Sequence, residues 1–155
     1  MLHTLKTTQF IKSDINTIWE FMSAPQNLAK ITPSHMGFTI VSDVNDLEKI
    51  YAGQIIEYDV TPVLGLKMHW VTEITHVKHL HYFVDEQRFG PYTLWHHKHF
   101  LKEVDGGVEM IDIIHYKIPF GFIGKIANAL FVKHKLKEIF DYRFKKLEEL
   151  YNVGK

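Results

Sequence analysis

The chain has 155 residues, in which 18 lysines and arginines balance 18 aspartates and glutamates, and it contains no cysteine. This length fits a single domain spanning residues 1–155. The missing cysteines exclude disulfides, thiolate nucleophiles and cysteine-ligated metal sites, and the zero net charge removes the main sequence-independent force for binding nucleic acid.

The first third of the chain predicts one strand followed by two short helices. Residues 2–11 are rich in threonine and other strand-forming residues. Ser13-Asp14 then offers a helix N-cap, because the apolar residues between positions 15 and 22 follow helical spacing. Pro25 ends this helix, and a second short helix is predicted over residues 26–31.

Six further strands are predicted in the middle of the chain, separated by residues typical of turns. Their ranges are 38–44, 53–61, 66–75, 80–87, 92–104 and 108–118. All the connections between them are short, whereas parallel strands need long crossovers. The seven strands are therefore predicted to form one antiparallel sheet.

The C-terminal part predicts one long helix from residue 122 to about residue 151. An apolar stripe follows helical spacing and consists of Ile126, Leu130, Leu136, Phe140, Leu147 and Leu150. A helix of about 30 residues is roughly 45 Å long, so it should cross the whole sheet. The fold class is then α+β, with a curved seven-stranded antiparallel sheet wrapped around a long C-terminal helix and two short helices after the first strand.

The hairpin around Asp105-Gly106 carries the most specific prediction, because Asp-Gly is a strong signal for a two-residue turn. With this turn, His99 lies opposite Asp112 and Trp95 lies opposite Tyr116. Strand alternation then places His97, His99 and Asp112 together on an otherwise apolar face, which should be the concave one. The other face of the hairpin carries the charged side chains and should meet solvent. Six further histidines are expected at the surface: His76, His79, His81, His96, His115 and His134.

A buried aspartate needs a partner, and a neighbouring imidazole can supply the hydrogen bond or the compensating charge. Three interpretations of His97, His99 and Asp112 stay open. They are a satisfied structural pair, a polar group that orients a ligand, or a chemical site, either for zinc or iron or with a histidine base oriented by Asp112. Two histidines two residues apart are a weak metal signal, so no metal and no cofactor are assigned, and these three residues are only candidates for catalysis.

No apolar run approaches the roughly 18 residues of a membrane span, and the N-terminus does not have the pattern of a secretory signal. We therefore expect a cytoplasmic protein. The mildly basic C-terminal helix limits any expected membrane contact to a peripheral one, and no oligomeric state is predicted.

Several segments together resemble a known family. They are Pro25-x-Asn27-Leu28 with Ile31-Thr32-Pro33, Phe83-x-Asp85-x-Gln87, Gly90-Pro91-Tyr92, Trp95-x-His97-x-His99, Asp112-x-Ile114-x-Tyr116-x-Ile118-Pro119 and the helix residues 131–143. The chain thus resembles, over about residues 2–150, the SRPBCC (START/Bet v 1-like) superfamily, and within it the small bacterial branch often labelled cell division inhibitor or polyketide cyclase/dehydrase-like. The resemblance implies a helix-grip fold with a hydrophobic cavity between the sheet and the long helix. It also implies binding of lipids, polyketides or quinone-like molecules, and in some members catalysis of cyclisation or dehydration.

The expected function is binding or carriage of a small hydrophobic ligand, with the ring-bearing side chains as cavity walls. The candidate ligand-binding residues are Trp70, Thr72, Asp85, Gln87, Trp95, His97, His99, Met110, Asp112, Ile114, Tyr116, Leu130 and Phe140. The alternative is a cyclase/dehydratase-type enzyme that uses His97 or His99 with Asp112 in that cavity.

Overall fold

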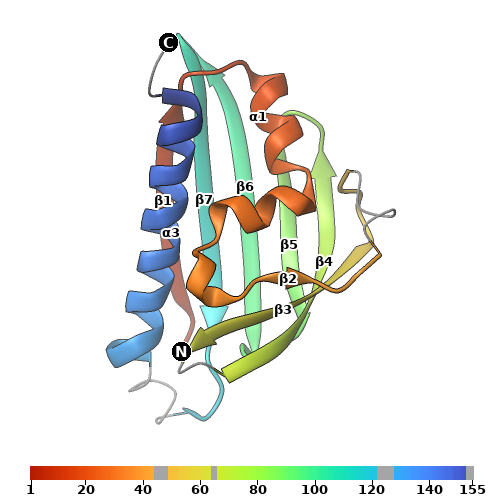
Figure 1. Ribbon diagram of the computed structural model, residues 1–155, viewed down its shortest axis with the longest axis vertical. Coiled ribbons are helices and arrows are strands. Elements are labelled where there is room, and N and C mark those ends of the chain that lie inside the picture. Colours follow the sequence, from red (N-terminus) through yellow and green to blue (C-terminus); the bar gives the residue numbers. More distant parts are fainter. Residues whose placement is uncertain (44–48, 64–65, 122–127, 153–155) are drawn as a thin grey trace.

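A computed structural model describes residues 1–43, 49–63, 66–121 and 128–152 (Figure 1). The strands are β1 (His3–Ile11), β2 (Thr39–Ile40), β3 (Gln54–Val63), β4 (Leu66–Lys78), β5 (Tyr82–Phe89), β6 (Leu94–Val104) and β7 (Gly107–Lys117). The helices are α1 (Ile15–Met22), the 3-10 helices η1 (Pro25–Ile31) and η2 (Ser34–Met36), α3 (Lys133–Leu147), and the π-helical segments η4 (Asn128–Val132) and η5 (Glu148–Asn152).

The seven strands form one antiparallel sheet with the order β1-β7-β6-β5-β4-β3-β2. In Figure 1, α3 runs lengthwise beside β1, and α1 with the short helices that follow it lies over the central strands. Helix α1 contacts β6 and β7, and η1 contacts α3. This arrangement confirms the predicted α+β helix-grip architecture, in which the described helices cover the concave face of the sheet.

The predicted register of the β6–β7 hairpin is confirmed. His99 pairs with Asp112, Trp95 pairs with Tyr116, and Val104 pairs with Gly107 across the Asp105-Gly106 turn. The two faces are also as predicted, because the side chains between Trp95 and Tyr116 alternate between the interior and the outer face. The turn therefore fixes which polar residues enter the interior.

The N-cap of α1 follows the prediction as well. The Asp14 carboxylate accepts a hydrogen bond from the Thr17 backbone N–H at 2.9 Å, which satisfies one of the free donors at the start of the helix. No helix among the described residues is long and apolar enough to cross a membrane.

Strand β2 is much shorter than the predicted 38–44 range. The backbone N–H groups of Val41 and Ser42 both donate to the Glu57 carbonyl, at 2.8 and 3.2 Å. The Ser42 hydroxyl also accepts the bond from the Glu57 N–H at 2.7 Å. Two donors on one carbonyl and a side chain in place of a backbone acceptor end the regular ladder at Ile40; residue 44 lies outside the described residues.

The long C-terminal helix is continuous from Asn128 to Asn152, and residues 122–127, including Ile126 of the predicted stripe, lie outside the described residues. The predicted stripe is wrong at two places, since Leu130 is 60% exposed and Leu150 is 52% exposed. Both residues lie in π-helical segments, where the step per residue differs from the α-helical one, so α-helical spacing does not extend to them.

The face of α3 that packs against the rest of the molecule consists of four buried residues, Leu136, Phe140, Arg143 and Leu147. Phe140 and Leu136 pack with Ile114 and Tyr116 in one apolar cluster. Leu147 belongs to another cluster, which joins Ile18 and Trp19 of α1 to apolar residues of the sheet. An arginine thus occupies a position of the helix that packs against the sheet.

Candidate functional site

A cavity of about 190 Å³ lies between the concave face of the sheet, helix α3 and the short helices after α1. Aliphatic and aromatic side chains supply most of its walls. Of the residues expected from the sequence, seven line it: Trp70, Thr72, Asp85, Trp95, His97, His99 and Phe140. An apolar cavity of about 150 Å³ is large enough to hold benzene, so this cavity has room for a ring.

Six of the expected residues do not line this cavity. Met110, Ile114 and Tyr116 are packed in the apolar clusters of the interior. Asp112 is buried behind the two histidines and borders a smaller space of about 70 Å³. Leu130 points to the surface on its π-helical segment.

Gln87, the sixth, holds the connection between β5 and β6. Its side-chain amide donates to the Tyr92 carbonyl at 2.6 Å, and its carbonyl oxygen accepts from the Tyr92 N–H at 3.1 Å. Gly90 between them has φ +152°, and a Cβ there would lie 2.6 Å from the Gln87 side-chain oxygen. Gln87 therefore acts indirectly, by setting the position of Tyr92, which does line the cavity.

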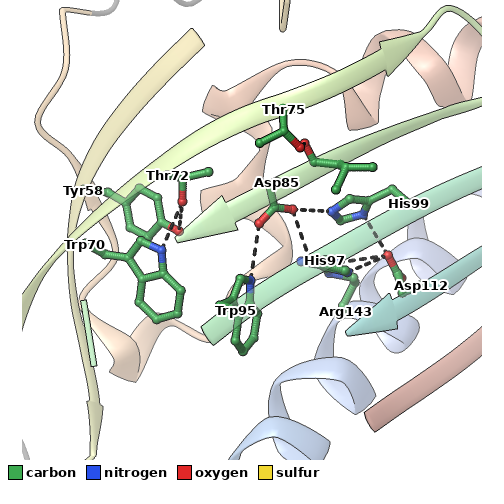
Figure 2. A network of polar contacts seen from close by, with 11 residues as sticks. Tyr58, Trp70, Thr72, Thr75, Asp85, Trp95, His97, His99, Asp112 and Arg143 are labelled. Atoms are coloured by element: carbon green, nitrogen blue, oxygen red, sulfur yellow. Dashed lines mark hydrogen bonds and ion pairs between the residues drawn. The ribbon is translucent and has the colours of Figure 1, made fainter. Parts of the chain in front are cut away.

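One wall of the cavity is a group of four aromatic rings, from Tyr58, Trp70, Tyr92 and Trp95. Neighbouring ring centroids within the group are 5.0–5.9 Å apart. The Trp70 indole N–H donates to the Thr72 hydroxyl at 3.0 Å, and the Tyr58 hydroxyl lies 3.0 Å from the same oxygen (Figure 2). Burial raises the pKa of the Tyr58 and Tyr92 hydroxyls, which keeps both neutral.

The polar end of the cavity contains two imidazoles between two carboxylates (Figure 2). Asp85 Oδ2 lies 2.9 Å from His99 Nε2 and 3.4 Å from His97 Nδ1. On the other side, Asp112 Oδ1 lies 3.1 Å from His97 Nε2 and 2.8 Å from His99 Nδ1. This last contact does not have the direction of a hydrogen bond, and His99 Nδ1 makes none.

These four residues come from three adjacent strands. His97 and His99 enter from β6, Asp112 lies opposite His99 on β7, and Asp85 lies opposite His97 on β5. The pairing of the histidines with Asp112 and the place of Asp85 among the cavity residues were expected from the sequence, whereas the contact between Asp85 and the histidines was not. The second oxygen of Asp85 accepts the Trp95 indole N–H at 3.3 Å, which connects the cluster to the aromatic wall.

Arg143 was missed by the sequence analysis and is the fifth member of the cluster. It is only 7% exposed, its Nη1 lies 3.7 Å from Asp112 Oδ1, and its guanidinium stacks 4.7 Å from the centre of the Phe140 ring. Its Nε and Nη1 atoms are buried and make no hydrogen bond. The spacing of Leu136, Phe140, Arg143 and Leu147 is the signal that could have found it, because this spacing belongs to one helix face.

The two histidines have opposite pKa shifts. Burial, followed by the positive charge of His99, lowers the pKa of His97 to about 4. Burial also acts to lower the pKa of His99, but its contacts with Asp112 and Asp85 outweigh burial and raise it.

The two carboxylates are held in the ionised form. Burial would raise the pKa of Asp112, but the contacts with His97, His99 and Arg143 hold it well below its usual range. The pKa of Asp85 is lowered in the same way, against burial, by His97 and His99. The negative charges of Asp85 and Asp112 therefore face the Arg143 guanidinium and His99, whose positive form they favour, while His97 is held toward its neutral form. This balance is what makes the cluster compatible with a buried position.

The histidines expected at the surface are there. His76, His79, His81 and His134 are exposed, and His96 and His115 are half-buried on the outer face of the sheet.

No known protein family matches the sequence, and no curated protein matches it. Solved structures do match in fold. A START superfamily protein from Mycobacterium smegmatis is 14% identical, with a TM-score of 0.70 over 96% of this chain and 99% of that one. The ginseng major latex-like protein 151 from Panax ginseng is 14% identical, with a TM-score of 0.68 over 97% of both chains. Protein CV1439 from Chromobacterium violaceum is 10% identical, with a TM-score of 0.73 over 97% of this chain and 98% of that one.

Proposed function

We propose that this chain, which has the SRPBCC (START/Bet v 1-like) fold, binds a small hydrophobic ligand that contains a ring, in the cavity between the sheet and α3. The observation that carries the proposal is the lining of that cavity, with apolar and aromatic walls and a few polar groups gathered at one end. This combination is typical of sites that bury an apolar molecule and orient it by one polar group.

The walls favour a ring over an acyl chain. Tyr58, Trp70, Tyr92 and Trp95 present ring faces and edges, and aromatic pairs gain about 0.5–1.5 kcal/mol beyond the burial of their area. A cavity of about 190 Å³ suits a ligand built on one substituted ring.

The polar end favours a ligand that carries an oxygen acceptor. Arg143 is among the residues that line the cavity. Its buried Nε and Nη1 atoms make no hydrogen bond, and such groups cost free energy until they find a partner. His97 and His99 also line the cavity, whereas Asp112 acts only by holding them. A carbonyl, phenol or carboxylate oxygen near Arg143 would satisfy these donors.

Thermal melting of the purified chain, stripped of lipid by refolding, tests this function. The test uses pairs of one-ring compounds, in which one member carries an oxygen and the other is the hydrocarbon of the same shape. A ligand at a hundred times its Kd stabilises by about 2.7 kcal/mol, which raises Tm by roughly 5–10 °C in a domain of this size. We expect the larger rise with the oxygen-bearing member; the proposal fails if no compound raises Tm and organic extracts of the unstripped protein contain no ligand.

A second candidate function is acid–base catalysis of a cyclisation or dehydration in the same cavity. The observation that favours it is the pair of cavity-lining imidazoles with oppositely shifted pKa values, whose ring centroids are 3.7 Å apart. Such pairs suit a base and an acid that act together. Neutral His97 would take the proton next to a carbonyl, and protonated His99 would protonate the departing hydroxyl, which leaves as water.

An aromatic β-hydroxyketone tests the catalytic candidate, because its dehydration gives a conjugated enone that absorbs in the near ultraviolet. An enzyme should form the enone, and His97→Ala and His99→Ala should each lose turnover while retaining binding. Absence of enone formation by the unmodified chain, under conditions where the ketone binds, would leave the binding function alone.

A further inference from the structure

We propose that Asp85, His97 and His99 form a binding site for one zinc ion at the polar end of the cavity. Each residue offers one ligand atom, and the three atoms lie within 4.8 Å of one another. Two imidazole nitrogens and one carboxylate oxygen are a ligand set that suits zinc. The inference concerns the ion alone and does not require that the cavity binds an organic ligand.

The distances between the ligand atoms are close to those that a zinc ion needs. Bonds of about 2.0–2.2 Å at tetrahedral angles separate neighbouring ligand atoms by about 3.3–3.5 Å. Asp85 Oδ2 now lies 2.9 Å from His99 Nε2 and 3.4 Å from His97 Nδ1. The Asp85–His97 separation already suits the ion, and the Asp85–His99 separation would need to widen by about half an ångström.

Asp112 is placed to orient His97, with which it makes a hydrogen bond, and it also lies beside the outer ring nitrogen of His99. The ring nitrogens that face away from Asp85, His97 Nε2 and His99 Nδ1, lie 3.1 and 2.8 Å from Asp112 Oδ1. When both carry their proton on these nitrogens, the lone pairs of His97 Nδ1 and His99 Nε2 face Asp85. Histidine ligands of metal ions are usually held in this way, by a carboxylate at the second ring nitrogen.

Asp85 is oriented as well. Its Oδ1 accepts the Trp95 indole N–H at 3.3 Å, which leaves Oδ2 directed at the two histidines (Figure 2). Two of the three ligands, His97 and Asp85, thus have a hydrogen-bonded outer partner that fixes their direction, a feature typical of built metal sites.

The remaining coordination positions of the ion would face the cavity, because all three ligands line it. Three protein ligands with an open position are the pattern of zinc sites that bind water or a substrate oxygen. The charges around the site are compatible with a divalent cation, because two carboxylates face the histidines. Among the described residues, Arg143 is the lysine or arginine in contact with the cluster, and it contacts Asp112, which is not one of the three ligands.

Isothermal titration calorimetry with zinc chloride tests the site, on untagged protein treated with EDTA and then freed of it. We expect one zinc ion per chain with micromolar or tighter affinity. His97→Ala and Asp85→Asn should each weaken it at least 100-fold, and Asp112→Asn should weaken it about 10–100-fold through the two histidines. Cobalt supplies a second readout, because a tetrahedral site with these ligands gives visible absorption.

The controls separate this site from surface binding. His96→Ala lies next to His97 on the outer face of β6 and should leave zinc affinity unchanged. His69→Ala removes an exposed histidine that contacts Glu57 and Asp59, a place where zinc could be held at the surface. Circular dichroism verifies that each variant is folded. The proposal is overturned if zinc does not bind at one equivalent, or if binding is lost in His69→Ala and kept in His97→Ala.

Discussion

Replacing Asp112 with alanine is expected to lower the free energy of unfolding by about 3–5 kcal/mol, because the change leaves uncompensated charge in the interior. The Asp112 carboxylate lies within 3.7 Å of His97, His99 and Arg143. Without it, two positive groups stay buried with only the carboxylate of Asp85 near them. Urea denaturation at pH 7, followed by tryptophan fluorescence, measures the change.

Glu109→Ala is the matched control, because Glu109 lies on the same strand, on the outer face opposite Lys102. Its replacement should alter stability by less than about 0.5 kcal/mol. Replacing Arg143 with methionine in the Asp112→Ala background should restore part of the loss, since it removes the cation that Asp112 had balanced. A loss below 1 kcal/mol in Asp112→Ala would contradict the charge balance assigned to the cluster.

The unfolding free energy is expected to rise by about 3 kcal/mol between pH 4 and pH 6.5 because of His97. In the folded protein the pKa of His97 is about 4, against 6.5 when it is exposed. Between these values the unfolded chain binds a proton that the folded chain does not, so acid favours unfolding. This contribution is fully present above pH 6.5 and is lost as pH falls to 4.

His99 has the opposite effect, because its pKa is raised above 6.5 in the folded state. Its contribution is complete below pH 6.5 and is lost as pH rises through the folded pKa. We therefore expect stability to be greatest near pH 6.5 and to fall on both sides.

Urea titrations at several pH values between 4.5 and 8 test both halves of this profile, since the two aspartates lose their contribution only at lower pH. His97→Gln should remove the fall in stability below pH 6.5, because glutamine stays neutral throughout this range. His115 on the outer face also has a lowered pKa, but it is present in both proteins and cancels in the comparison. If the unfolding free energy of His97→Gln falls below pH 6.5 as much as that of the unmodified chain, His97 is not the cause of the fall.

The part of the site that lies on one hairpin could be predicted from the sequence, because a two-residue turn fixes its register. Asp105-Gly106 determines that His99 faces Asp112, and strand alternation determines that His97 shares their face. The contact of Asp85 with the same histidines depends on the register of β5 against β6. That register is set by a longer connection, held by Gln87 and Tyr92, which no local pattern specifies.

In the C-terminal helix, the sequence predicted only some of the buried residues. Alpha-helical spacing located Leu136, Phe140 and Leu147 correctly, and it failed at Leu130 and Leu150 because the helix changes to π geometry at both ends. Arg143 was missed because a charged residue is assigned to the solvent side by default. The charge of Asp112, which lies far from Arg143 in the sequence, favours a buried arginine at that position, and so does the stacking on Phe140.

If the cavity under α3 binds the ligand, a variant that fills this cavity should bind it more weakly. Ile139 on α3 lines the cavity, and an indole at this position would extend into it, whereas Lys145 is exposed on the same helix. Calorimetric titration should use the one-ring compound that raises Tm most. We predict that the unmodified chain and Lys145→Trp bind it with equal affinity and that Ile139→Trp binds it at least tenfold more weakly; equal affinity in all three proteins would contradict the account.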